Sequence, residues 1–316
     1  MGARCGAPSL GALGNSYLEA GGWQLSIAQR WLHSDRHFIG EVEQKQRERD
    51  GSQIINDVHT IDFTTTYGIT PRVSIGLTLP FIYARRSGPL DRANDHDITA
   101  SGLGDVRLAT SVWVLDPATH VDGNFAFGVG IKTPTGDYEA RDIRYRNRTI
   151  GGVPTVVAEE DYVDRSIQPG DGGWGVLLDM QAFQKVFDRT YAYAGATYLI
   201  NPREKITTTG NSVWDAYLLR IGVSYTIWPS KGLALSLGAR MEGVPSTDWF
   251  GGSSGSRRPG YSIGIEPGIT WSYKKFSINV SAPVAIENNR ERNYLGNPGD
   301  AAFADYLITS SMSYRF

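Results

Sequence analysis

The sequence predicts an all-β fold, a transmembrane antiparallel up-and-down β-barrel of about 12 strands. Three observations support this prediction. Apolar and polar residues alternate with a period of two along many short stretches, the links between these stretches alternate between short and long, and aromatic residues gather at their ends. Period-two strands with short periplasmic turns and long extracellular loops are typical of bacterial outer-membrane barrels.

Composition excludes several other classes of protein. Hydrophobic residues make up 41% of the 316 residues, and no apolar run approaches the ~20 residues that a membrane helix needs. The formal net charge of −2 shows no basic excess, so nucleic acid is not an expected partner. One cysteine, Cys5, cannot form an internal disulfide framework or a cysteine-rich metal site, and no cofactor is expected.

The amino-terminal stretch 1–21 is rich in Gly, Ala and Ser and shows no period, which predicts a flexible leader on the periplasmic side or inside the lumen. The barrel is expected to span 22–316. Cys5 could carry a lipid, but Met-Gly-Ala-Arg before it is not apolar, so a cysteine in a disordered tail is the preferred interpretation. The first ten residues lack the apolar core of a signal peptide, so an export signal is expected to have been removed or replaced.

Twelve amphipathic stretches follow one another along the chain. In the clearest of them, Val73–Ala84, Val, Ile, Leu, Phe and Tyr occupy one face, and mostly small or polar residues occupy the other. The expected strands are Trp23–Trp31, Ile61–Ile69, Val73–Ala84, Asp105–Leu115, Asn124–Lys132, Trp174–Val186, Tyr191–Ile200, Tyr217–Ile227, Leu233–Met241, Tyr261–Tyr273, Phe276–Ile286 and Phe303–Phe316.

The links between these strands differ consistently in length. The short ones are Thr70–Arg72, Asp116–Gly123, Asp188–Thr190, Pro229–Gly232 and Lys274–Lys275. The long ones are Ser34–Val58, Arg86–Gly104, Pro134–Gly173, Asn201–Val213, Val244–Gly260 and Asn288–Ala302. A soluble β-sandwich is not expected to separate loop lengths this regularly, so the pattern favours the barrel, with both termini on the short-turn side.

The longest link, Pro134–Gly173, contains its own period-two pattern. Three alternating arginines precede Gly151-Gly152, and an acidic run follows at Glu159-Glu160-Asp161. This pattern predicts a β-hairpin that projects outside the membrane, with arginines facing acids. The alternative, a loop that folds inward and narrows the pore, stays open.

Aromatic residues are expected to form a belt at each interface. Near the short turns lie Tyr67, Phe187, Tyr191, Trp228, Trp271, Tyr273, Phe276, Tyr314 and Phe316. Near the long loops lie Trp31, Tyr83, Tyr198, Tyr217, Tyr261 and Tyr306. The chain ends on an amphipathic strand with an aromatic residue, which predicts a closing strand that pairs with the stretch from Trp23 to Trp31.

Several short motifs resemble those of a family of bacterial outer-membrane channels labelled with the meta-pathway of phenol degradation. They are Gly102-Leu103-Gly104-Asp105-Val106-Arg107-Leu108, Gly130-Ile131-Lys132-Thr133-Pro134-Thr135-Gly136-Asp137-Tyr138 and Glu266-Pro267-Gly268-Ile269. The resemblance implies an outer-membrane transport role and provides no catalytic residues. It also implies that the barrel-assembly machinery recognises the aromatic carboxyl-terminal end.

The inward faces of the expected strands carry the charges. We expect a polar, mixed-charge constriction built from Arg107, Lys132, Arg220, Arg240, Glu242, Glu266, Asp179 and Asp62. Register places Arg107 opposite Lys132, so an anionic group such as Asp137, or a ligand, is expected between them. Glu287 and Asp305 share the inward parity. A barrel filled by mutually satisfied ion pairs is the alternative interpretation of the same charges.

The sequence therefore predicts a porin-like channel in the outer membrane of a Gram-negative-type bacterium. Small solutes would pass through its lumen with weak ion selectivity, and its partners would be outer-membrane lipid, the solutes and the assembly machinery. Two alternatives remain: a barrel enzyme that acts on lipids through the outward-facing His59, and a closed barrel whose loops form an interaction surface. The sequence leaves open a homo-oligomer or a larger envelope complex.

Overall fold

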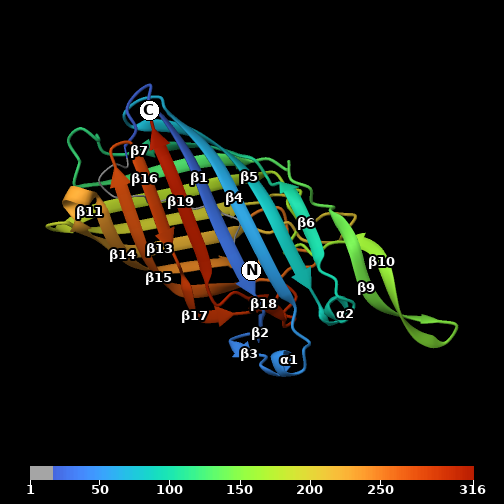
Figure 1. Cartoon of the computed structure of the whole chain (residues 1–316). Helices are drawn as coiled ribbons and strands as arrows, with labels where there is room; N and C mark the ends of the chain where they lie inside the picture. The colour runs from blue at the N-terminus through green and yellow to red at the C-terminus, as the bar shows by residue number, and fades with distance from the viewer. Residues whose placement is uncertain (1–16) are drawn as a thin grey trace.

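The computed structural model describes residues 17–316 and confirms the predicted fold class. These residues form a closed antiparallel barrel of 12 wall strands, in which the last strand pairs with the first (Figure 1). Cys5 and most of the expected leader lie outside the described residues. Within 17–316, no helix combines the length and the apolar composition that a membrane span requires.

The wall strands follow the chain in order around the barrel. They are β1 (Trp23–Ser34), β4 (Ile55–Gly68), β5 (Val73–Ser87), β6 (Ile98–Leu103) continued by β7 (Arg107–Trp113), β8 (Gly123–Lys132), β11 (Gly175–Phe187), β12 (Thr190–Ile200), β13 (Ala216–Trp228), β14 (Leu233–Val244), β15 (Gly260–Tyr273), β16 (Phe276–Ser281) continued by β17 (Val284–Asn289), and β19 (Leu307–Arg315).

The seam between β1 and β19 closes as the terminal sequence pattern predicted. Leu25 pairs with Tyr314, and Trp31 pairs with Ile308. Trp23 and Phe316 exchange two backbone hydrogen bonds of 3.0 Å each. The barrel therefore leaves no free strand edge at this seam, as a membrane-spanning sheet requires.

Short and long connections separate to opposite ends of the barrel (Figure 1). The turn between β13 and β14 includes the 3₁₀ turn η1 (Pro229–Lys231) and then Gly232, which adopts a left-handed φ of 67°. A Cβ at Gly232 would lie 1.8 Å from the Ser272 carbonyl oxygen, so this tight turn requires glycine.

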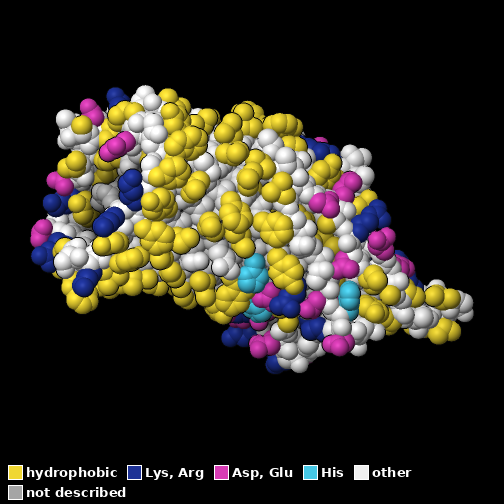
Figure 2. All heavy atoms as spheres, turned by 45° about the horizontal axis from the view of Figure 1, so that its top comes forward, with side chains coloured by type: hydrophobic (Ala, Val, Ile, Leu, Met, Phe, Trp, Pro, Cys, Tyr) yellow, Lys and Arg dark blue, Asp and Glu magenta, His cyan; other side chains and the backbone are white. Residues whose placement is uncertain are grey.

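Hydrophobic side chains cover the outside of the wall, and charged side chains gather at its two ends (Figure 2). Val129 is 58% exposed and Ile221 is 64% exposed, although both lie in the middle of regular strands. Apolar side chains on this face are stable only against lipid. With the closed barrel, this surface defines a protein of the outer membrane of a Gram-negative-type bacterium.

Aromatic rings lie at both rims of the apolar surface. Trp271 stacks on Tyr273 near the short turns, with ring centroids 6.1 Å apart, and Trp31 contacts Tyr306 near the long loops at 5.9 Å. The prediction that Tyr191 belongs to the lipid-facing aromatic belt near the short turns was wrong. Its ring lies 6.5 Å from that of Phe183, which is buried on the inner face of β11.

One predicted strand is interrupted. The expected strand Phe276–Ile286 divides into β16 and β17 at Ala282-Pro283, because proline has no N–H to donate to a neighbouring strand. Beyond the break, the pairing of β17 with β15 shifts by one residue at Ile286, because the consecutive residues Ile263 and Gly264 pair with Glu287 and Ala285. The inward placement of Glu287 was wrong as a result, and its carboxylate accepts a hydrogen bond of 2.9 Å from the Tyr261 hydroxyl.

The long loops carry small elements of their own. They are β2 (Arg36–Ile39), β3 (Val42–Glu43) and β18 (Ala301–Phe303), which form one sheet, the hairpin of β9 (Arg141–Ile150) and β10 (Val153–Tyr162), and the short helices α1 (Gln46–Arg49) and α2 (Pro89–Ala93). The hairpin projects from the long-loop end (Figure 1), and Arg148 pairs with Glu159 across it. The small sheet is joined to the barrel by Arg36, which pairs with Asp305 just before β19.

Candidate functional site

The lumen contains two cavities, one above the other. The outer cavity, on the long-loop side, has a volume of about 520 Å³, and the inner cavity, towards the short turns, has a volume of about 310 Å³. Ala28, Asp62 and Ser311 line both cavities, so the two meet at this level of the barrel. Each volume is of the size that small-molecule sites have in proteins.

A chain of ion pairs runs across the lumen where the two cavities approach each other. Arg220 forms a bidentate pair with Glu266, with both bonds 2.8 Å long. Arg240 pairs with Glu242 at 2.7 Å and lies 3.8 Å from Glu266. Arg30 on β1 reaches Glu242 on β14 at 2.6 Å. The structure thus brings together the four residues that the sequence placed here and adds Arg30.

The two carboxylates are more deeply buried than Arg220 and Arg30, and Arg240 is as deeply buried as Glu242. The side chains of Glu266 and Glu242 are 2% and 7% exposed, whereas those of Arg220 and Arg30 are 13% and 18% exposed. Buried carboxylates need charged partners, because an unpaired buried charge is very costly. The arginines supply this pairing, and Arg30, Arg220 and Arg240 also line the outer cavity.

Arg107 and Lys132 lie directly opposite each other on β7 and β8, as the register argument predicted. The anionic groups expected beside them are present, but Asp137 is not the one. Arg107 binds Asp62 at 2.7 Å, and Lys132 binds Asp171 and lies 3.8 Å from Asp105. The two cations therefore have separate counter-charges, and the repulsion between neighbouring like charges is relieved.

Asp179 faces the inner cavity from β11 and accepts a 2.6 Å hydrogen bond from Thr197. Twelve Ser and Thr residues line the same cavity, and Thr64 and Thr78 hydrogen bond to each other at 3.0 Å. The inner lumen thus offers hydroxyl groups to a solute.

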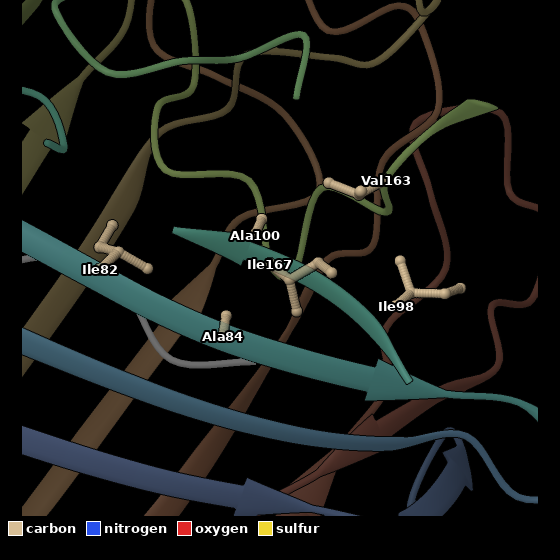
Figure 3. Close-up of a cluster of buried hydrophobic side chains, with 6 residues drawn as sticks. All are labelled: Ile82, Ala84, Ile98, Ala100, Val163 and Ile167. Atoms are coloured by element: carbon tan, nitrogen blue, oxygen red, sulfur yellow. The ribbon is translucent and has the colours of Figure 1, made fainter. Parts of the chain in front are cut away.

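A segment of the longest loop folds into the barrel mouth. We call Val163–Asp171, which follows the external hairpin, the inner loop. Its Val163 and Ile167 pack against Ile82 and Ala84 on the inner face of β5 and against Ile98 and Ala100 of β6 (Figure 3). Different segments of the longest loop therefore follow the two alternatives: β9 and β10 form an external hairpin, and the inner loop folds into the barrel.

Ion pairs fix the inner loop to the rest of the outer lumen. Asp164 accepts two hydrogen bonds from Arg258, at 2.6 and 2.9 Å, and lies 3.5 Å from Arg86. Burial by itself would raise the pKa of Asp164, but Arg258 and Arg86 outweigh it and hold this pKa well below its usual value. Arg165 lies over the ring of Trp214 at 3.9 Å.

An aromatic cluster that the sequence analysis missed lies against the wall near the short turns. Tyr17 packs edge-on to Trp113, with ring centroids 5.0 Å apart, and Phe183 and Tyr193 complete the cluster. Gly222 makes room for it, since a Cβ there would lie 2.5 Å from the Tyr193 hydroxyl. The glycine-rich inner faces of the following strands are the signal that could have revealed these inward rings.

His59 faces outward in the aromatic belt on the long-loop side. Its ring stacks on Trp31 and lies beside Tyr83, with centroids 6.3 Å apart in each case. This placement gives His59 the packing of an interfacial side chain.

The closed wall and the apolar outer surface define a transmembrane β-barrel of the outer-membrane type. An outer membrane channel from Pseudomonas putida F1 has a similar structure, with a TM-score of 0.61, 11% sequence identity and coverage of 95% of this chain and 97% of that one. The β domain of the Bordetella autotransporter BrkA is similar with a TM-score of 0.51, 14% identity and coverage of 94% and 100%.

At these identities the likeness concerns the fold. No protein-family model matches the sequence, and no curated protein matches it significantly.

Proposed function

We propose that this protein is an outer-membrane channel through which small solutes pass passively. The observation that carries the proposal is the pair of cavities inside a closed wall, which meet at Ala28, Asp62 and Ser311. Solutes that cross a barrel need polar groups along their path, and charged and hydroxyl side chains line both cavities beside apolar ones. A solved protein of the same fold, from Pseudomonas putida F1, is itself an outer membrane channel.

In this proposal the ion pairs form the constriction. Arg107, Lys132, Arg220 and Arg240 supply cations, while Asp62, Asp179, Glu242 and Glu266 supply acids. Because most of these charges are paired, we expect ions of both signs to pass, with a mild preference for anions where arginines face the cavity. A steep preference for ions of either sign would contradict this constriction.

From the resemblance to the phenol meta-pathway family, we take only that the protein is a transporter-like outer-membrane barrel. We do not propose phenol as its solute. We also propose that the aromatic end of β19 is the segment that the barrel-assembly machinery engages. Neither point alters the test of the channel.

Single-channel recording in a planar lipid bilayer tests the proposal directly. The purified full-length protein is expected to give discrete conductance steps in KCl. Absence of steps from folded, inserted protein would favour a closed barrel that presents its loops. Lipid turnover that survives purification and disappears in His59→Ala would favour the barrel enzyme.

A further inference from the structure

Hydroxyl side chains form a continuous row along the wall of the inner cavity. Each residue of the row pairs directly with the next one across neighbouring strands, in the order Ser272, Ser277, Ser313, Ser26, Thr64 and Thr78. We call these residues the hydroxyl row. The row crosses β15, β16, β19, β1, β4 and β5, which follow one another around the barrel, and all of its residues line the inner cavity.

Part of the hydroxyl row remains available to a solute. Within residues 17–316, the hydroxyl groups of Ser277 and Ser313 make no hydrogen bond to the protein, and the Ser272 hydroxyl is buried without a hydrogen-bond partner. A hydroxyl group can both donate and accept a hydrogen bond, and a buried one that is left unpaired is costly. These three serines therefore favour a solute that carries hydroxyl groups of its own.

A carboxylate oxygen beside the hydroxyl row also lacks a partner. Asp62 lies on the same face of β4 as Thr64, two positions earlier in the strand, and lines the inner cavity. Arg107 donates a 2.7 Å hydrogen bond to its Oδ2, whereas its Oδ1 is buried and has no hydrogen-bond partner among the described residues. A carboxylate oxygen can only accept, so a solute hydroxyl group can pair with it and an anionic oxygen cannot.

The arginines that line the inner cavity are bound to groups of the protein. Arg107 pairs with Asp62, as described above. Arg72 donates hydrogen bonds to two backbone oxygens at the end of β7, and Arg315 donates a 2.8 Å hydrogen bond to the Gln24 side chain. The hydrogen-bonding groups that this cavity offers to a solute are therefore mainly neutral hydroxyl groups.

The side of the cavity that faces the hydroxyl row is apolar. Ala109 and Trp113 on β7, Ala126 on β8 and Leu177 on β11 line it. These strands lie half-way around the barrel from β15, β16 and β19, so they face the first part of the row across the lumen. A ring that carries several hydroxyl groups has polar edges and faces made of C–H groups. The inner cavity, with a volume of about 310 Å³, offers a matching surface to each part of such a molecule.

We propose that the inner cavity is a binding site for neutral polyols of the size of a monosaccharide. The hydroxyl row and Asp62 bind the hydroxyl groups of the solute, and Trp113 and Leu177 contact its C–H face. The proposal rests on the channel function and names a class of solute that the channel takes. Hydrogen bonds between neutral groups are individually modest, which suits a solute that has to leave the site again.

Three probes test this class of solute: myo-inositol, cyclohexanol with the same ring and a single hydroxyl group, and inositol monophosphate with the same polyol and a negative charge. Each is titrated into the full-length protein in detergent by calorimetry, and each is added to the short-turn side of single channels. We expect myo-inositol to bind and to interrupt the current at concentrations at least about tenfold lower than the other two, a difference of about 1.4 kcal/mol. An affinity for either other probe that equals or exceeds that for myo-inositol would overturn the proposal.

The double variant Ser277→Ala with Ser313→Ala locates the site. It removes two adjacent hydroxyl groups of the row and is expected to weaken myo-inositol binding about tenfold, because two hydrogen bonds to the solute are lost. The matched control is Ser224→Ala with Ser236→Ala. These two serines also pair directly, on β13 and β14, but line neither lumen cavity, so binding is expected to be unchanged. Unchanged binding in the first double variant would overturn the assignment.

If the first double variant fails to fold, as judged by circular dichroism, Thr78→Val tests the same row with a side chain of similar shape. It is expected to weaken myo-inositol binding about threefold or more, and unchanged binding would contradict the proposal. Calorimetry also separates the two proposals. Binding of myo-inositol without conductance would reject the channel and keep the site, whereas conductance with no preference for myo-inositol would reject the site and keep the channel.

Discussion

At the scale of single residues, the charge of the lumen depends on which carboxylate pairs with each arginine that lines it. Glu266 holds Arg220 by two hydrogen bonds and approaches Arg240, while its own side chain is 2% exposed. It therefore neutralises two cations that line the outer cavity. Its charge should influence both stability and ion passage.

We expect Glu266→Gln to raise the preference of the channel for chloride over potassium, because it leaves Arg220 and Arg240 with less counter-charge. Breaking a buried ion pair should also destabilise the barrel by about 3–5 kcal/mol. Reversal potentials in a KCl gradient and urea unfolding measure the two effects. Glu287→Gln at the exposed outer rim is the matched control, and an equal shift in both variants would contradict the role of Glu266.

His37, in the small sheet of β2, β3 and β18, makes the stability of that sheet sensitive to pH. Its Nδ1 lies 2.8 Å from Asp300, and its Nε2 accepts a 2.9 Å hydrogen bond from the Ile54 backbone N–H. This arrangement requires the neutral ring, with the proton on Nδ1. Burial lowers the pKa of His37, although the hydrogen bond to Asp300 acts in the opposite direction and Arg47 adds to the lowering.

Because this pKa is lower in the folded protein than in the unfolded chain, His37 contributes stability above the unfolded pKa of about 6.5 and loses it as pH falls. We expect hydrogen-exchange protection of Ile54 and β2 to decrease between pH 7.5 and pH 5, after correction for intrinsic exchange. His37→Gln should remove most of this dependence. The same decrease in the variant would show that another group is responsible.

At the scale of elements, the inner loop is the part of the structure best placed to set the width of the outer lumen. It lies against β5 and β6 through Val163 and Ile167, and Asp164 ties it to Arg258 and Arg86. Apolar packing and one buried acid together keep it inside the barrel.

Asp164→Asn is expected to release the inner loop. The substitution leaves Arg86 and Arg258 without the carboxylate that they share, and it removes two charged hydrogen bonds. The loss of stability should be about 3–5 kcal/mol, and conductance should rise or fluctuate more. Asp161→Asn provides the control, since that residue pairs with Arg146 in the external hairpin, where such a pair contributes about 0–1 kcal/mol. Identical conductance in Asp164→Asn and wild type would show that the loop does not limit passage.

The strands could be predicted because the pattern that marks a strand depends only on residues close together in the sequence. Alternation along β5 and at the Trp23–Phe316 seam follows directly from a two-residue period, and the opposition of Arg107 to Lys132 follows from one short turn. The inner loop could not be predicted this way. Asp164 meets Arg258 across 94 residues of sequence, and no period relates two loops that meet in space.

The aromatic side chains that face the lumen could not be predicted for a related reason. Tyr193 occupies an inner position only because Gly222 and Gly238 on the neighbouring strands leave space for its ring. Whether a large residue faces lipid or the lumen thus depends on small residues on other strands. The interruption at Pro283 had a visible local signal, since proline within a strand predicts a break.

At the scale of the whole molecule, the central claim is that the two cavities form one path through a closed wall. Ala28, Asp62 and Ser311 line both cavities, so the path runs past these residues. Ser311 pairs with Ala28 on one side and with Asn279 on the other. Its neighbour Met312 points to the opposite face of β19, is 42% exposed and lines neither cavity. These two positions offer a direct comparison.

The most direct measurement is the single-channel conductance of Ser311→Trp beside that of Met312→Trp. A tryptophan at Ser311 places a large ring where the two cavities meet, whereas one at Met312 faces lipid. We expect Ser311→Trp to lose most of the conductance and Met312→Trp to retain it, with both variants folded and inserted. Full conductance in Ser311→Trp, or equal loss in both variants, would contradict a single path through the lumen.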